Sequence, residues 1–184
     1  MSYDLTVRLK RLDDTMIPQW ISEINKFNMR VEVYPKFTFS DHSGFLPFKV
    51  VNYDCPNPRF NNIELLTGYE LDIQRMSLVP VKKSFVHKWF SGNNTKNTDE
   101  EIQSNAEIEV TFSISIQDSF EFRIGWYSAA ALAMIGDGVL IDHQEGIEVQ
   151  GNRLIRHAYD TVLQDEKTIK EDEWKVHEFD EWKE

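Results

Sequence analysis

Residues 108–116 alternate strictly between apolar and polar side chains, and this pattern restricts the chain to folds that contain a sheet with one buried face. Apolar residues occupy every second position, and Glu, Thr and Ser lie between them. Side chains on a strand point alternately to its two faces. The segment therefore predicts a half-buried β-strand, the clearest in the chain.

An apolar, alanine-rich segment follows that strand. Asp118 or Ser119 can cap a helix that runs to about Ile135, and the small side chains of residues 129–133 allow the helix to pack closely against a sheet. We expect Gly136 to end the helix in the left-handed conformation that glycine adopts readily.

The rest of the chain mixes strand and helix patterns. Alternation predicts strands at 3–10, 69–74 and 78–87, and a short buried strand at 139–142. Helical spacing predicts helices at 17–27 and 152–163. Residues 30–39 alternate as well, although Pro35 limits them to an edge strand or two short pieces. Residues 41–62 are rich in Pro, Asn and Gly and are expected to be irregular.

These elements predict an α+β fold with a mixed or antiparallel sheet and helices mainly on one face, in the order β-α-β-(loop)-β-α-β-α. A chain of 184 residues can bury roughly 70% of its unfolded surface, which suffices for one good core. We expect a single domain at 1–165, a mobile loop at about 91–105 and an acidic, aromatic-containing tail at 166–184.

Charge is distributed unevenly along the chain. Residues 1–92 hold 12 Lys/Arg and 10 Asp/Glu, a net charge of +2, whereas residues 93–184 hold 8 and 21, a net charge of −13. A field of this sign repels nucleic acids and anionic lipid, and it steers basic proteins toward the chain. The expected partner is therefore a basic protein.

The carboxy-terminal tail is the predicted partner-binding segment, because it combines carboxylates with aromatic side chains, as interface anchors often do. Its expected contact residues are Glu171, Asp172, Glu173, Trp174, Glu178, Asp180 and Trp182. The alternative is that Trp174 packs on the body of its own chain. The aromatic content favours one of these two contacts over a plain solvated tail.

No residue pattern identifies a reaction. Cys55 is the only cysteine and has no evident histidine partner, and no two histidines have metal-ligand spacing. Gly136-Asp137-Gly138 follows a helix and precedes a strand, the reverse of a phosphate loop. We therefore expect no catalytic residue, metal or cofactor. The alternative is an enzyme with a dispersed site near Asp142, His143 and His157.

Composition also bears on the compartment. A lone cysteine excludes a disulfide framework, and the amino terminus lacks the apolar stretch of a secretory signal. The longest apolar-leaning stretch, 124–135, is much shorter than the twenty or so residues that cross a bilayer. We expect a cytoplasmic protein without a membrane partner.

Several short segments resemble a bacterial protein family. They are Tyr3-Asp4-Leu5-Thr6-Val7, Ser43-Gly44-Phe45-Leu46-Pro47, Gly68-Tyr69-Glu70, Ala129-Ala130-Ala131-Leu132-Ala133 and Gly138-Val139-Leu140-Ile141-Asp142. Together they resemble the small acidic immunity proteins encoded beside contact-dependent or polymorphic toxins. The resemblance covers about residues 3–146, and the glycine doublet usual before the final strand is here Gly136-Asp137-Gly138.

The resemblance implies an intracellular protein that binds and occludes one cognate toxin domain, often a basic nuclease, and it implies no catalytic residues. An acidic adaptor or structural binding module is the remaining alternative. The sequence leaves the oligomeric state open.

Overall fold

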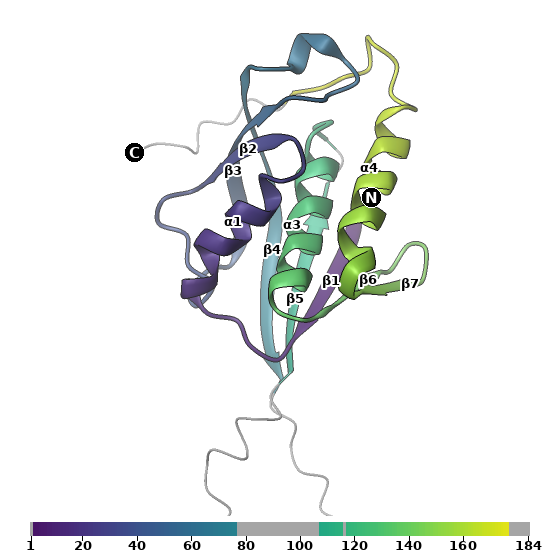
Figure 1. Cartoon of the computed structure of the whole chain (residues 1–184). Helices are drawn as coiled ribbons and strands as arrows, with labels where there is room; N and C mark the ends of the chain where they lie inside the picture. The colour runs from purple at the N-terminus through teal and green to yellow at the C-terminus, as the bar shows by residue number, and fades with distance from the viewer. Residues whose placement is uncertain (1, 77–106, 116, 177–184) are drawn as a thin grey trace, which may run out of the picture.

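The computed structural model describes residues 2–76, 107–115 and 117–176 (Figure 1). Its strands are β1 (Tyr3–Leu9), β2 (Met29–Val33), β3 (Gly44–Asn52), β4 (Glu64–Met76), β5 (Glu107–Ile114), β6 (Val139–Asp142) and β7 (Ile147–Gln150). Its helices are α1 (Ile17–Ile24), α3 (Glu121–Ile135) and α4 (Leu154–Glu166). The predicted strand at 78–87 and the predicted loop at 91–105 lie outside the described residues.

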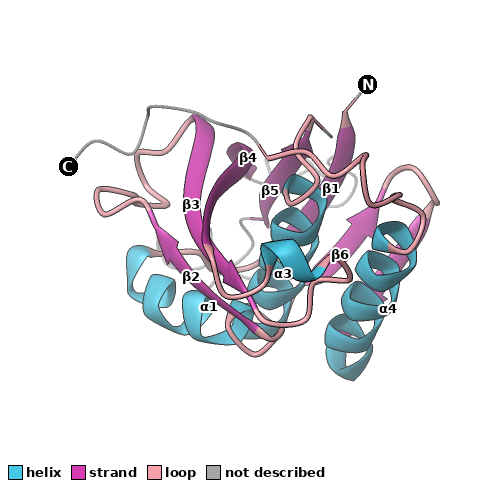
Figure 2. Ribbon diagram, turned by 90° about the horizontal axis from the view of Figure 1, so that it is seen from above, coloured by secondary structure: helices cyan, strands magenta, loops and turns pink. Residues whose placement is uncertain are grey.

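The strands form one sheet in the order β2-β3-β4-β5-β1-β6-β7, and every neighbouring pair is antiparallel. Seen from above, α1, α3 and α4 all lie on the same side of this sheet (Figure 2). The predicted α+β fold with helices on one face is therefore confirmed, and the sheet is antiparallel rather than mixed. β1 lies between β5 and β6, so the amino-terminal strand is inside the sheet rather than at its edge.

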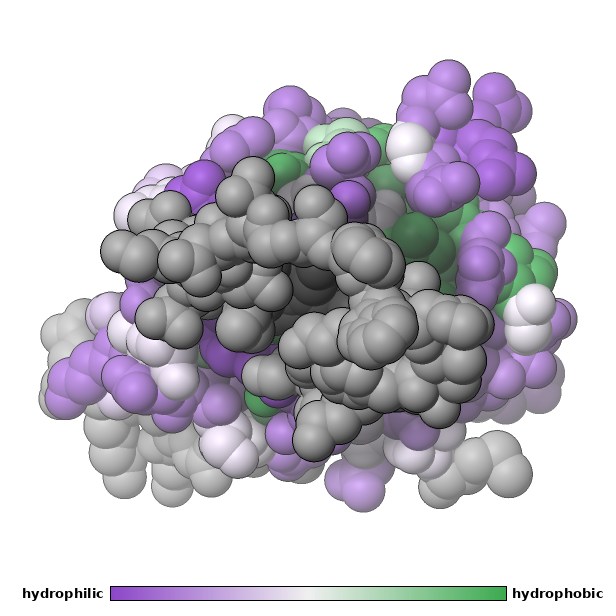
Figure 3. All heavy atoms as spheres, turned by 90° about the horizontal axis from the view of Figure 1, so that it is seen from below, coloured by the Kyte–Doolittle hydropathy of each residue, from purple (hydrophilic) through white to green (hydrophobic). Residues whose placement is uncertain are grey.

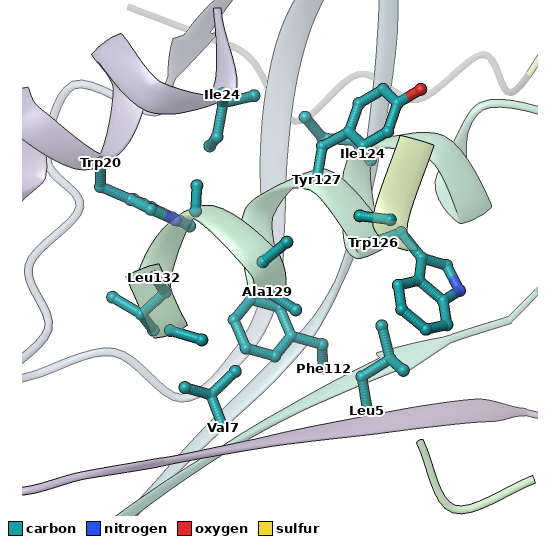
Figure 4. Packing of buried hydrophobic residues seen from close by; sticks show 14 of the residues in the cluster. Leu5, Val7, Trp20, Ile24, Phe112, Ile124, Trp126, Tyr127, Ala129 and Leu132 are labelled. Atoms are coloured by element: carbon teal, nitrogen blue, oxygen red, sulfur yellow. The ribbon is translucent and has the colours of Figure 1, made fainter. Parts of the chain in front are cut away.

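The core lies between α3 and the central strands. Phe112 of β5, as the alternation predicted, points with Leu5 and Val7 of β1 toward α3, where Ala129 and Leu132 meet them (Figure 4). Fully burying a side chain of this size contributes about 1.5–3 kcal/mol. The side chains of α3 are buried from Glu121 to Ala133, which is typical of a helix at the centre of a core.

Small residues let α3 approach the sheet. A β-carbon added at Gly125 would lie 2.5 Å from Cδ1 of Ile114 on β5. On the other side of α3, the indole Nε1–H of Trp20 in α1 donates a hydrogen bond of 2.8 Å to the Ser128 carbonyl. The predicted close packing of the alanine-rich helix is confirmed.

The two ends of α3 differ from the prediction. The helix begins at Glu121, and Asp118 accepts a hydrogen bond from the Phe120 N–H just before it. Gly136 has φ −91°, so its predicted left-handed conformation is wrong; Asp137 takes that role with φ 48°. Gly136 is instead required for space, because a β-carbon there would lie 2.7 Å from Cδ2 of Leu9.

The prediction of irregular structure at 41–62 is wrong for residues 44–52, which form β3. Pro47 concealed the strand. It pairs with Gly68 on β4. On the β2 side, the last register pair is Val33–Phe48, so Pro47 lies just beyond the pairing with β2 and its missing N–H interrupts no pair there. β7 was also missed, because a strand of four residues after a turn carries too little pattern.

Several boundaries also moved. β2 ends at Val33, two residues before Pro35, and forms one edge of the sheet as predicted. β4 begins five residues earlier than expected, and α1 ends at Ile24. α4 continues to Glu166, so the helix reaches the beginning of the predicted tail.

Candidate functional site

Residues 167–176 turn back from the end of α4 and attach to the body of the domain (Figure 1). The Ser119 N–H donates to the Lys175 carbonyl at 3.0 Å, and the Lys175 N–H donates to Oγ of Ser119 at 2.8 Å. Farther back along the segment, the Asn57 side-chain amide donates to the Glu171 carbonyl at 3.4 Å. These bonds fix the backbone on either side of Trp174.

Trp174 is the apolar anchor of this segment. Its ring centroid lies 5.5 Å from that of Phe120 and 5.9 Å from that of Phe60. These rings pack against a small buried cluster that includes Cys55 and Leu65. The structure therefore shows the contact with its own chain that the sequence left as an alternative for Trp174.

The end of α4 is held by a buried ion-pair network. Arg123 of α3 donates to both carboxylate oxygens of Glu166, at 2.6 and 2.7 Å, and its third nitrogen donates to Asp54 at 2.7 Å. Burial lowers the pKa of Arg123, but the hydrogen bonds and charges of Glu166 and Asp54 outweigh it and raise that pKa overall. Burial raises the pKa of Glu166, and Arg123 opposes this.

Two adjoining cavities lie beside α4, one of about 500 Å³ next to the attached segment and one of about 480 Å³ next to β1 and the turn between β6 and β7. Phe122, Asp165 and Thr168 line both, so we treat the cavities as one groove. The first cavity is lined further by Gln117, Asp118, Ser119, Ile169, Asp172, Glu173 and Lys175. The second is lined further by Tyr3, Asp142, Glu145, Ile147, His157, Thr161 and Gln164.

The walls of this acidic groove carry six carboxylates and one lysine. Asp165 lies where the two cavities join, and burial raises the pKa of its carboxyl group. Among the described residues, no Lys or Arg lies within ion-pair distance of Asp165. A half-buried carboxylate without a cation favours an incoming cation, because pairing would offset its lost hydration.

Asp142 is held rigidly in the second cavity. Its Oδ2 accepts a hydrogen bond of 2.6 Å from the Tyr3 hydroxyl, and its Oδ1 accepts from the Gln144 and Glu145 N–H groups. Burial, together with the hydrogen bond to Asp142, raises the pKa of Tyr3 well above its ordinary value. The hydroxyl therefore remains a donor at neutral pH.

The three residues of the enzyme alternative are only partly brought together. Asp142 and His157 line the same cavity, where the ring of His157 lies 5.6 Å from that of Trp126. His143 instead contacts Oγ1 of Thr6 at 2.8 Å and is not among the residues that line the cavity. His143 is the first residue of the turn after β6; Asp142 pairs with Leu5, whereas His143 contacts Thr6, whose side chain points to the opposite face of β1.

The predicted tail residues fall into two groups. Asp172 and Glu173 line the acidic groove. Glu171 and Trp174 line a third cavity of about 420 Å³ beside Asn57 and Glu166. The remaining three, Glu178, Asp180 and Trp182, lie outside the described residues. The sequence reasoning missed Asp118, Glu145 and Asp165 as groove residues, since no local pattern links these distant positions.

Other kinds of site find no support in the described ranges. Across residues 2–76, 107–115 and 117–176, no three His, Cys, Asp or Glu side chains are placed to share a metal ion. No helix in these same ranges has the length and apolar character needed to span a bilayer. Comparisons with protein-family models, with curated proteins and with solved structures found no match.

Proposed function

We propose that this chain is an immunity protein of the cytoplasm, which binds a basic toxin domain and blocks it by occlusion. The observation that carries the proposal is the acidic groove, in which Asp165 is half-buried and has no cationic partner among the described residues. A lysine or arginine side chain of the partner would supply the missing charge. The resemblance of residues 3–146 to immunity proteins supports the same function.

The charge of the chain adds a kinetic argument. Its net charge of −11 attracts a basic domain over long range and so raises the rate of encounter. Steering of this kind acts over about one Debye length, which shortens from about 30 Å in 0.01 M salt to about 3 Å in 1 M salt. The association rate constant should therefore fall steeply with salt, whereas the dissociation rate should change less.

The proposal predicts that a large secreted protein with a basic carboxy-terminal domain is encoded directly upstream of this chain, and that domain is the partner for the test. Asp165→Lys and Asp172→Lys should each weaken binding to that domain and reduce protection of cells that produce it. Asp41→Lys is the matched control, because Asp41 is exposed on the loop before β3 and distant in sequence from the groove. Equal binding by the groove variants and the control would contradict the proposal.

The alternative functions predict other results. An enzyme in the second cavity gains support from the shared position of Asp142 and His157, and His157→Ala should then abolish activity in a variant that still folds. The immunity proposal predicts that His157→Ala still protects. An acidic adaptor would bind the basic domain without reducing its toxicity, so measuring binding and toxicity together separates the adaptor from the immunity protein.

A further inference from the structure

The three helices cover one side of the sheet, and no described helix covers the other side of its central strands (Figure 2). We call that second side of β4, β5 and β1 the outer face. Its side chains include Glu70, Asp72 and Gln74 of β4, Glu107, Glu109, Thr111 and Ser113 of β5, and Asp4, Thr6 and Arg8 of β1. Viewed from below, most described residues around the edge of the molecule are hydrophilic, and hydrophobic residues show on one side (Figure 3).

The outer face carries carboxylates in excess. Arg8 is its one cation, and Arg8 forms an ion pair with Glu109 at 2.6 Å. Glu107, at the start of β5, also interacts electrostatically with Arg8, which leaves Glu70 and Asp72, both exposed, and the half-buried Asp4. Within the described residues, none of these three carboxylates lies within ion-pair distance of a Lys or Arg.

The register places these carboxylates close together. Glu70 and Asp4 both pair with Ser113 of β5, so they lie in one row across the sheet. Two strand spacings separate them, about 10 Å. Asp72 is two residues along β4 from Glu70, about 7 Å away on the same face. The three charges thus form a compact triangle.

An imidazole does not neutralise this triangle at neutral pH. His42 interacts electrostatically with Glu70, but burial lowers the pKa of His42, so its ring is uncharged at pH 7. The ring also contacts the Gly44 carbonyl, at 3.0 Å. His42 therefore leaves the charge of Glu70 in place, and the other imidazole near this face, that of His143, contacts Oγ1 of Thr6.

The shape of the outer face suits an elongated partner. Along β5 the side chains between the carboxylates are the short hydroxyls of Thr111 and Ser113, so this row of the face is low, whereas on β1 the ring of His143 contacts the buried Thr6. The distance of about 10 Å between the axes of β4 and β1 is close to the diameter of an α-helix with its side chains, about 10–12 Å.

We propose that the outer face docks a lysine- and arginine-rich α-helix of the partner protein. The inference rests on the proposed function, because it names a contact surface for the same basic partner. Charge complementarity carries it: the carboxylates of β4 and β1 would flank a helix that lies along β5 and pair with basic residues on both of its sides. The surface is distinct from the acidic groove, which lies on the helix-covered side of the sheet.

The test uses the full chain and an alanine-based helical peptide that carries arginines along one face. We expect Glu70→Lys/Asp72→Lys to weaken its binding by about tenfold or more, because like charges then face each other. The matched control is Asp41→Lys/Asp160→Lys, which changes the net charge equally at exposed positions outside the face. The affinity of this control variant for the peptide should fall by less than about twofold. Thermal unfolding verifies that both variants fold.

Two results would overturn the proposal. The first is an equal loss of affinity for the peptide in the control variant, which would show that the net charge of the chain attracts the peptide without a specific site. The second is undiminished binding of the peptide by the face variant. In each case, binding of the toxin domain that still depends on Asp165 leaves the proposed function intact.

Discussion

Arg123 of α3 and Glu166 at the end of α4 form a bidentate ion pair that is almost completely buried, with side-chain exposures of 3% and 1%. The guanidinium also lies 5.8 Å from the ring centroid of Tyr127, which stacks on Phe27 at 4.0 Å. One arginine thereby connects the two helices that border the acidic groove with the loop that carries Asp54.

Arg123→Met should lower the free energy of unfolding by about 3–5 kcal/mol, because it leaves the Glu166 carboxylate buried and unpaired. The double variant Arg123→Met/Glu166→Leu should recover much of that loss, since it removes both charges. Denaturant unfolding of the two variants measures the difference. A double variant as unstable as the single one would show that packing, rather than the unpaired charge, dominates the loss.

Trp174→Ala should detach residues 170–176 from the body and destabilise the protein by about 1–3 kcal/mol, less than a fully buried tryptophan, because Trp174 is only partly buried. The variant should also expose Cys55, which shares the same cluster. Thermal unfolding and the rate of alkylation at Cys55 are the two measurements. Trp174→Phe is the matched control, since it keeps an aromatic ring between Phe60 and Phe120.

Cys55 in the native protein should react very slowly with iodoacetamide at pH 8. Burial raises the pKa of its thiol to about 11, so little thiolate is present, and the side chain is almost inaccessible. Unfolding in urea should restore the reactivity of an ordinary cysteine. Rapid alkylation of the folded protein would contradict the buried position of Cys55.

Asp165→Asn should stabilise the isolated protein at pH 7 while it weakens binding to the basic domain. Burial raises the pKa of Asp165 in the folded state, so its ionised form opposes folding. The Asp165 carboxyl group therefore contributes most to stability below the pKa that it has in the unfolded chain. This contribution is lost as the pH rises through the pKa that it has in the folded protein. The gain from Asn should therefore disappear in acid, which melting curves across the acidic range would show.

Gly138→Ala should destabilise the protein by about 1–3 kcal/mol through overpacking. A β-carbon there would lie 2.5 Å from the Arg8 carbonyl oxygen, and the backbone of β1 cannot move aside as a flexible side chain can. Chemical denaturation measures the loss. At Gly146 a β-carbon meets nothing within 4 Å, so Gly146→Ala provides a comparison in which backbone strain acts alone.

The strongest local patterns predicted their elements correctly. The alternation of β5 and the apolar character of α3 are properties of consecutive residues, and burial follows from that periodicity wherever the element packs. β3 could not be found in this way, because Pro47 indicates a loop unless its position relative to β2 is known. The short strand β7 has too few residues for an alternating pattern to be recognised.

The sequence by itself determined the fold class, the surplus of carboxylates and the presence of aromatic anchors in the tail. Periodicity, charge and aromatic content depend only on which residues follow one another in the chain. Only the tertiary structure decided where those charges meet. Asp118, Asp142 and Asp165 lie on three separate segments, and the packing of α4 beside α3 brings them to one groove. The same packing buries Arg123 against Glu166. These two residues are 43 positions apart, so no local pattern in the sequence indicated their contact.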